Sequence, residues 1–229
     1  MSWITIAFFG ALPFYLSNIG LNFTDSFFES MSGITTTGST ILINIEISPP
    51  GILVWRSLLQ WLGGIGVIVM AIAIFPMLSV GGMQLFKAEN FENPEKVIPR
   101  ATSLTRGIFI IYSVLTLIWA SLLYISGMSS FDSILHSMTT IATGGYSTKS
   151  GSIGAFNSQL IDWIIILGMI FGSLPFVHYL AMTKGSYRDL IKDSQVRWFL
   201  VLLTILVLTI FSLLFLNGTY DWKDSIRYS

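Results

Sequence analysis

The stretch TDSFFESMSGITTTGST at residues 24–40 returns as FDSILHSMTTIATGGYST at residues 131–148, and this repetition decides the fold. A shift of 107 residues aligns the two copies without a gap, and seven of 14 positions are then identical. The identical pairs are Asp25/Asp132, Ser26/Ser133, Ser30/Ser137, Met31/Met138, Ile34/Ile141, Thr36/Thr143 and Gly38/Gly145. Because a sequence repeat dictates an architectural repeat, the chain is predicted to contain tandem copies of one structural unit.

Each copy begins with a predicted short helix, over residues 24–34 and 131–141. Residue types that favour the N-cap stand at the start of both helices: Asp25 or Ser26 in the first copy, Asp132 or Ser133 in the second. Roughly ten helical residues extend about 15 Å, which is half of a bilayer core. Neither helix is therefore long enough to cross a membrane.

A stretch rich in threonine and glycine follows each short helix. We call residues 35–40 the first Thr/Gly segment and residues 142–148 the second Thr/Gly segment. Non-helical backbone at membrane depth is tolerated only where it is buried in protein or lines water. A half-length helix followed by such a segment is typical of a re-entrant pore loop.

The composition indicates a membrane protein. Hydrophobic residues make up 53% of the chain and charged residues 10%, whereas a soluble domain carries about 25% charged residues. Twelve basic residues balance twelve acidic ones, which gives no electrostatic attraction to nucleic acid, and the absence of cysteine excludes disulfides and thiolate metal sites. The N-terminus lacks the pattern of a removable signal peptide.

Five stretches without charged residues are long enough to span a bilayer, and they surround the two copies. They are residues 2–22, 57–86, 107–127, 163–182 and 198–216. The predicted fold is all-α and integral to the membrane, with tandem repeats of helix, re-entrant pore loop and helix. Repeat one covers residues 2–86, with its second helix at 52–86, repeat two covers 107–183, and 198–229 begins a third repeat.

Basic residues predict which connections are cytoplasmic. The connections 87–106 and 184–197 hold eight of the twelve Lys and Arg residues, in far fewer positions than the remaining loops. Both connections are therefore predicted to be cytoplasmic, and both short helices then start from the outer side. Residues 224–229 match 132–137 at four of six positions, so the chain is expected to be part of a longer protein with more repeats.

The Thr/Gly segments predict a site for a monovalent cation. Backbone carbonyls and threonine hydroxyls can replace the hydration shell of potassium without a fixed charge. Glycine permits backbone angles that point successive carbonyls one way, and the negative end of each short helix favours a cation. The candidate filter residues are Thr36, Thr37, Gly38, Thr143, Gly144 and Gly145. Two segments alone do not close a ring.

Several of these residues have a structural alternative. Gly38 and Gly145 could be ordinary turn glycines, and Thr36 and Thr143 could bond the end of their helix. Glu29 and the equivalent His136 are either functional groups or structural groups behind the segments. His178 is interpreted as a hydrogen-bonded residue rather than a metal ligand. Gly63, Gly64 and Gly66 are interpreted as packing residues.

The chain resembles the membrane subunit of the Trk/Ktr/HKT potassium-transporter superfamily, and is most similar to the bacterial TrkH type. The resemblance is carried by FFESMSGITTTGST (27–40), WRSLLQWLGGIGVIVMAIAIFPMLSVGGMQLFKAE (55–89) and ATGGYST (142–148). It covers the whole chain, but only the first two of the four repeats of that family and the start of the third. Each repeat there gives one filter glycine, which implies Gly38 and Gly145 here. Gly144 departs from Thr37 at the same position of the first copy.

The resemblance also implies the setting of the protein. It implies potassium uptake through a multi-pass protein of the bacterial inner (plasma) membrane, with potassium as the transported ion and no other cofactor. Family members work as homodimers with a cytoplasmic, nucleotide-binding regulatory subunit of the TrkA type, so these partners, together with membrane lipid, are expected.

Two other function classes were compared with conduction. A sodium- or proton-coupled secondary transporter would use broken helices, which glycine-rich span two could supply. It predicts inverted repeats, however, and both copies here start on the same side. An intramembrane enzyme is disfavoured because no pair among His136, His178 and Glu29 has the spacing of a nucleophile and base along a helix.

Overall fold

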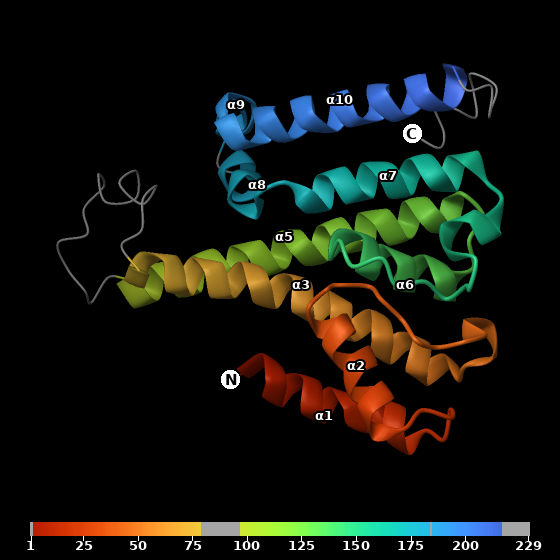
Figure 1. Ribbon diagram of the computed structural model, residues 1–229. Coiled ribbons are helices and arrows are strands. Elements are labelled where there is room, and N and C mark those ends of the chain that lie inside the picture. The colour runs from red at the N-terminus through yellow and green to blue at the C-terminus, as the bar shows by residue number, and fades with distance from the viewer. Residues whose placement is uncertain (1, 79–96, 184, 217–229) are drawn as a thin grey trace. The chain divides into compact units, whose positions relative to one another are not determined.

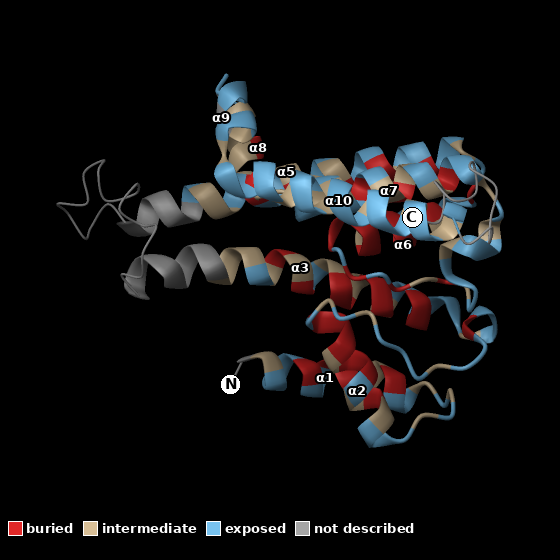
Figure 2. Cartoon of the chain, turned by 45° about the horizontal axis from the view of Figure 1, so that its top comes forward, coloured by how far each residue is buried: buried red, intermediate tan, exposed pale blue. Residues whose placement is uncertain are grey.

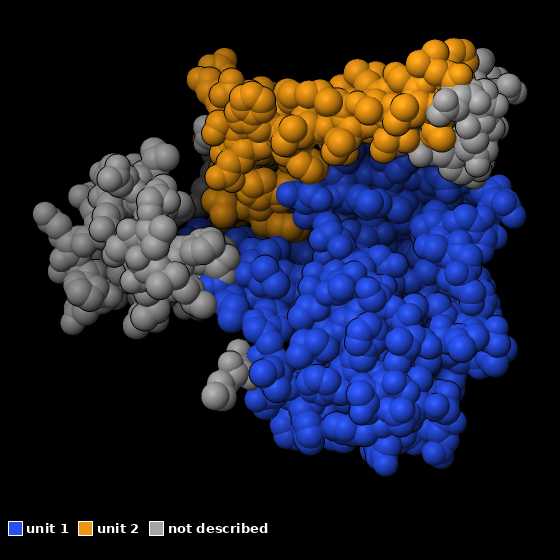
Figure 3. Space-filling model, in the orientation of Figure 1, with its two compact units in different colours: residues 1–173 blue, residues 174–229 orange. Residues whose placement is uncertain are grey.

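The computed structural model describes residues 2–78, 97–183 and 185–216, and the regular elements in this part of the chain are all helical (Figure 1). The chain divides into two compact units, residues 1–173 and residues 174–229 (Figure 3). Both pairs of predicted short helices and Thr/Gly segments lie in the first unit. The third partial copy, at residues 224–229, lies outside the described residues.

In the described part of the chain, repeat one contains α1 (Ser2–Leu16), α2 (Phe23–Ile34), the short 3-10 helix η1 (Ile45–Ile47) and α3 (Pro50–Leu78). The predicted short helix 24–34 is thus observed as α2. Helix α3 begins with a proline, whose missing N–H is not needed at a first helical position. It packs against α2, which also packs against α1.

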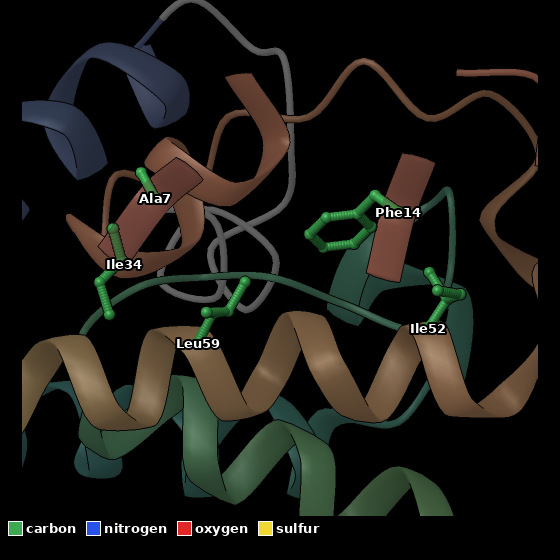
Figure 4. Close-up of a cluster of buried hydrophobic side chains, with 5 residues drawn as sticks. All are labelled: Ala7, Phe14, Ile34, Ile52 and Leu59. Atoms are coloured by element: carbon green, nitrogen blue, oxygen red, sulfur yellow. The ribbon is translucent and has the colours of Figure 1, made fainter. Parts of the chain in front are cut away.

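A cluster of apolar side chains holds the three helices of repeat one together (Figure 4). Ala7 and Phe14 come from α1, Ile34 from the end of α2, and Ile52 and Leu59 from α3, and all five side chains are buried. In a membrane, close packing rather than exclusion of water holds helices together. The cluster therefore fixes the end of α2, where the first Thr/Gly segment starts.

Repeat two has the same order of elements: α5 (Val97–Ile125), α6 (Ser130–Ile141), η3 (Ser152–Phe156) and α7 (Gln159–Ser173). The predicted short helix 131–141 is observed as α6. It packs against α5 and α7 of its own repeat and also against α3 of repeat one. Figure 2 shows that buried residues concentrate on α2, on α6 and on the adjoining part of α3. The two repeats thus meet where the Thr/Gly segments begin.

The second unit contains α8 (Phe176–Thr183), α9 (Tyr187–Lys192) and α10 (Ser194–Leu216). His178 Nε2 lies 3.1 Å from Asp193 Oδ2, which agrees with the prediction of a hydrogen-bonded histidine. The backbone N–H of Val196 donates to the Asp193 carboxylate and lowers the pKa of Asp193. The two contacts of Asp193, with His178 of α8 and with Val196 of α10, therefore link α8 to the start of α10.

The predicted spans differ from the helices in two places. Span four, residues 163–182, is interrupted between α7 and α8 because Pro175 lacks an N–H and restricts Leu174 before it. Span one, residues 2–22, is the 15-residue helix α1, and Asn18 and Gly20 beyond it have φ of 53° and 83°. Such left-handed residues end a helix.

Residues 107–125 of span three and all of span five each lie in a single helix, as does the described part of span two, residues 57–78. α3, α5 and α10 are each long and apolar enough to cross a membrane. Helix α5 begins at Val97, so residues 97–106 of the predicted cytoplasmic connection 87–106 are helical. The end of predicted span two, residues 79–86, lies outside the described residues.

Both N-cap predictions were wrong by a few residues. The caps are Asn22 and Ser129, which lie 107 residues apart like the repeat itself. Asn22 Oδ1 accepts from the N–H of Asp25 at 2.9 Å, and Ser129 Oγ accepts from the N–H of Asp132 at 3.0 Å. Each aspartate therefore stands in the first helical turn, where its charge favours the positive end of the helix.

Candidate functional site

The first Thr/Gly segment turns back onto the end of α2. The N–H of Thr36 donates to the Gly33 carbonyl and the N–H of Thr37 to the Ser32 carbonyl, both at 3.0 Å. These two bonds are the Schellman pattern, which satisfies the last carbonyls of a helix. In a trans peptide the C=O points opposite to the N–H, so the Thr36 carbonyl points away from α2.

The second segment repeats this arrangement at the end of α6. The N–H of Thr143 donates to the Thr140 carbonyl at 3.0 Å, and the N–H of Gly144 donates to the Thr139 carbonyl at 2.9 Å. The same geometry as in the first segment directs the Thr143 carbonyl away from α6. The duplicated sequence therefore forms a duplicated backbone.

Left-handed backbone recurs at matched positions of both segments. Thr36 and Thr143 have φ of 55° and 53°, and Gly38 and Gly145 have φ of 79° and 81°. The residue between each pair does not have a positive φ. Gly38 and Gly145 are thus more than spacers, because only glycine adopts this conformation without strain.

Threonine is an unusual residue for the left-handed position after a helix. Glycine normally occupies it, and a β-branched residue there costs on the order of 1–3 kcal/mol. Within the described residues the hydroxyls of Thr36 and Thr143 make no hydrogen bond. Thr35 Oγ1, not Thr36, bonds back to α2, at 2.7 Å from the Met31 carbonyl. The strained threonines therefore hold unused hydroxyls beside the outward carbonyls.

The candidate oxygens are mostly unpaired. No hydrogen bond in the described part of the chain ends at the carbonyls of Thr36, Thr37, Gly38, Thr143 or Gly145. Gly144 differs, because its carbonyl accepts from Gln60 Nε2 at 3.0 Å. The two segments also touch, since a Cβ on Gly38 would collide with the Gly144 carbonyl oxygen.

Behind the first segment lies a buried ion pair. Arg56 Nε donates to Glu29 Oε1 at 2.8 Å, and the side chains are 2% and 0% exposed. The same carboxylate accepts from Thr40 Oγ1 at 2.8 Å and from the N–H of Ile41 at 3.2 Å. Glu29 thus has the structural role that was one of its two alternatives, because it anchors the far end of the segment.

His136 holds the second segment at the position equivalent to Glu29. Its Nε2 lies 2.9 Å from Ser147 Oγ, and its Nδ1 lies 2.8 Å from the Asp132 carbonyl. A carbonyl only accepts, so Nδ1 carries a proton and, in the neutral ring, Nε2 accepts from the hydroxyl. Ser147 is the repeat equivalent of Thr40, so both segments are anchored at the same place by different groups.

Helix α3 of repeat one also reaches the second segment. Arg56 Nη1 donates to the Ser147 carbonyl at 3.1 Å, and its guanidinium lies 4.1 Å from the centre of the Tyr146 ring. The Tyr146 hydroxyl donates to the Glu29 carbonyl at 2.8 Å and lies 3.3 Å from the Ser39 carbonyl. One arginine and one tyrosine thus link the two segments.

A further link joins the loops that follow the segments. Glu46 Oε1 accepts from the N–H of Ser150 at 2.7 Å and Oε2 from the Ser150 hydroxyl at 2.6 Å. The hydrogen bond from the Ser150 hydroxyl is the main cause that lowers the pKa of Glu46. This exposed contact connects η1 of repeat one to the chain just beyond the second segment.

Sequence reasoning did not identify Arg56, Gln60 or Tyr146. A signal was present: Arg56 and Gln60 stand four residues apart on an otherwise apolar helix, and polar groups inside a membrane helix are rarely without a partner. The packing prediction for Gly63 and Gly64 was correct. A Cβ on Gly63 would collide with the Ile34 carbonyl oxygen, and one on Gly64 would lie 2.7 Å from the Tyr112 hydroxyl.

Comparison with known proteins agrees with this architecture. The chain matches TrkH, described as a cation transport protein, over residues 1–222. It is 44% identical to the Trk system potassium uptake protein TrkI of Halomonas elongata, over 92% of this chain and 43% of that protein. It is 41% identical to TrkH of Escherichia coli K12, over 96% of this chain and 46% of that protein.

A solved structure has the same fold. The crystal structure of the potassium transporter TrkH from Vibrio parahaemolyticus superimposes with a TM-score of 0.86 at 34% identity, over 98% of this chain and 46% of that one. The chain thus spans about half the length of the relatives it matches. It is an integral membrane protein, and the organisms of its relatives fit a bacterial inner membrane. The chain belongs to the TrkH family of cation transport proteins.

Proposed function

We propose that this protein takes up potassium across the bacterial inner membrane through a pore whose wall includes both Thr/Gly segments. The observation that carries the proposal is the set of unpaired carbonyls at Thr36, Thr37, Gly38, Thr143 and Gly145. An unpaired carbonyl in a membrane costs several kcal/mol unless something polar replaces the missing partner. A dehydrated potassium ion is such a partner.

The residues of the chain have separate roles in this proposal. The carbonyls and the Thr36 and Thr143 hydroxyls replace the water of the ion, and Gly38 and Gly145 permit the backbone that presents them. Gly144 is part of the wall, but its carbonyl is held by Gln60. The carbonyl ends of α2 and α6 add negative potential. Two segments alone do not close a ring around the ion.

The names of the relatives support the choice of ion and of partners. They are Trk system potassium uptake proteins, which favours potassium over sodium and association with other components of a Trk system. We propose a homodimer bound to a cytoplasmic nucleotide-binding subunit of the TrkA type. The protein is proposed to be a transporter without catalytic activity. The distribution of basic residues predicts that both copies start on the same side, which favours a pore over the inverted repeats of alternating access.

A pair of matched glycines tests the proposal. Gly145 and Gly20 have φ of 81° and 83°, and a Cβ at either would meet nothing within 4 Å. Alanine at either position therefore costs about the same backbone strain, on the order of 1–2 kcal/mol, but only Gly145 lies in a Thr/Gly segment.

The measurement is the uptake of rubidium and potassium by cells that lack other potassium uptake systems and that express the protein as it is naturally produced. Gly145→Ala is expected to weaken potassium affinity or its preference over sodium by at least about tenfold, the effect of one or two lost ligands of about 1 kcal/mol each. Gly20→Ala is expected to behave like the wild type. Equal behaviour of the two variants, or no potassium uptake by the wild type, would contradict the proposal.

A further inference from the structure

Gln60 uses both ends of its amide on the second Thr/Gly segment. Its Nε2 donates to the Gly144 carbonyl at 3.0 Å, and its Oε1 accepts from the N–H of Tyr146 at 3.1 Å. The side chain is fully buried. The two peptide groups that it binds flank Gly145, so Gln60 fixes the backbone on both sides of that glycine.

The binding of the Tyr146 N–H also orients the neighbouring carbonyl. In the same trans peptide, the Gly145 C=O points opposite to the Tyr146 N–H. It therefore points away from Gln60 and from α3. Gln60 thus holds one carbonyl of the segment back, that of Gly144, and turns the next one, that of Gly145, to the unpaired side.

Gln60 also accounts for Gly144, which stands where the first copy has Thr37. The first copy has Thr37, whose exposed side chain bonds Thr35 Oγ1 at 2.8 Å. The second copy has Gly144, and a Cβ there would collide with the Gln60 amide. Gly144 is buried and does not have a positive φ. The glycine is therefore required by the space that Gln60 occupies and not by the backbone conformation.

A second side chain of α3 binds the same segment. Arg56 stands one turn before Gln60 on α3 and donates to the Ser147 carbonyl, so the two side chains lie on the same face of the helix. The Arg56 side chain is in turn fixed by the buried Glu29. Gln60 itself is fully buried and both ends of its amide are hydrogen-bonded, so its side chain is fixed against the second segment.

We propose that Gln60 is a positioning residue, which sets the preference of the second Thr/Gly segment for potassium over sodium by fixing the peptide groups on both sides of Gly145. The inference rests on the proposed function. Preference between the two ions depends on how many carbonyls face the ion and how they are held. Loss of Gln60 frees the Gly144 carbonyl and lets the Gly145 carbonyl turn.

The first test is Gln60→Leu, which removes both hydrogen bonds and keeps most of the volume. Loss of one to two buried hydrogen bonds of about 1 kcal/mol each corresponds to about a tenfold change. The expected result is about a tenfold smaller ratio of potassium to sodium affinity, measured as inhibition of rubidium uptake by each ion, with maximal uptake changed much less.

The matched control is Thr116→Val. Trp61 Nε1 donates to Thr116 Oγ1 at 3.0 Å, and Thr116 Oγ1 donates to the Tyr112 carbonyl at 2.8 Å. This variant therefore removes two hydrogen bonds, one of them between α3 and α5, without touching either segment. It is expected to keep the wild-type ion preference. If both variants change the preference equally, Gln60 acts through general stability and the inference is wrong.

The second test is Gly144→Ala, whose Cβ must displace the end of the Gln60 side chain. It is expected to lower the ratio of potassium to sodium affinity as much as Gln60→Ala does. The variant that carries both Gly144→Ala and Gln60→Ala is expected to have a ratio no lower than that of either single variant. This pair carries the test if Gln60→Leu does not reach the membrane. Additive losses would overturn the inference. If the wild type takes up potassium and Gln60→Leu has an unchanged ion preference, the inference about Gln60 is wrong but the proposed function stands. If the wild type takes up no potassium, the proposed function is wrong.

Discussion

The two Thr/Gly segments have the same backbone and different supports. Both turn back on their helix by the same pair of hydrogen bonds and have left-handed residues at the same positions. The first is anchored by the carboxylate of Glu29, which is paired with Arg56. The second is anchored by His136 and is bridged by Gln60 from the other repeat.

This difference separates what an ion requires from what a fold requires. In the proposed pore an ion meets only the carbonyls and hydroxyls, which accounts for the duplication of the residues that shape the backbone. The groups behind it need only satisfy each segment in its own surroundings, and these differ because α3 contacts α2 on one side and α6 on the other. If the two supports differ as their contacts indicate, substitutions at equivalent positions of the two segments have unequal effects.

The largest effect is expected at the ion pair. Arg56→Leu leaves the Glu29 carboxylate buried without its charged partner, which costs about 3–5 kcal/mol. His136→Leu removes two hydrogen bonds without leaving a buried charge, at about 1–3 kcal/mol. Thermal unfolding of the detergent-solubilised protein measures both. A larger loss of stability in His136→Leu than in Arg56→Leu would break the comparison.

Next comes a pair of glycines that share a backbone conformation. Gly38→Ala and Gly145→Ala each add left-handed strain of about 1–2 kcal/mol. A Cβ on Gly38 also collides with the Gly144 carbonyl, whereas Gly145 has open space, so Gly38→Ala is expected to lose a further 1–3 kcal/mol or so. The yield and unfolding temperature of folded protein would show this. Equal stability of the two variants would mean that the segments do not touch.

A smaller effect is expected for the hydroxyl that joins the segments. Tyr146→Phe removes the donor to the Glu29 carbonyl but keeps the ring under Arg56. The Ser39 carbonyl keeps the Ser32 hydroxyl, 2.6 Å away. The expected loss is about 1 kcal/mol in unfolding free energy. A matched control is Tyr124→Phe, since that side chain is 59% exposed, and an equal loss in both variants would argue against the link.

The smallest effect is expected at the exposed contact of Glu46 with Ser150. The pKa of Glu46 is lowered from 4.5 by the Ser150 hydroxyl, so the carboxylate contributes stability above pH 4.5 and this contribution is lost as the pH falls through the lowered value. Glu46→Gln is expected to unfold at a slightly lower temperature at pH 7, with the difference shrinking below pH 4.5. A difference that grows in acid would contradict the direction of the shift.

Local sequence patterns predicted the repeated part of the fold well. The half-length helices 24–34 and 131–141 are α2 and α6, with starts one residue earlier. The repeat itself predicted the Thr/Gly segments, because copies that share residues are expected to share the local backbone conformation. The N-caps were missed because Asp25 and Asp132 suit the first turn as well as the cap, and both positions favour acidic or hydroxyl residues.

The supports of the segments could not be predicted from local patterns. Arg56 and Gln60 act on residues 91 and 84 positions away, and no periodicity encodes such pairs. The distribution of basic residues places Arg56 outside the two cytoplasmic connections and predicts no partner for it. The interruption of span four was hidden by the apolar residues on both sides of Pro175, which make one continuous hydrophobic stretch.

In the proposed function, one dehydrated monovalent cation binds the matched oxygens of both segments, which accept no hydrogen bond from the described part of the chain. Crystals of the naturally produced protein, grown with thallium in place of potassium, would locate such ions by anomalous diffraction. We expect peaks within ligand distance of the carbonyls of Thr36 and Gly38 and of Thr143 and Gly145. Crystals that bind thallium elsewhere while these carbonyls contact only water would contradict the account.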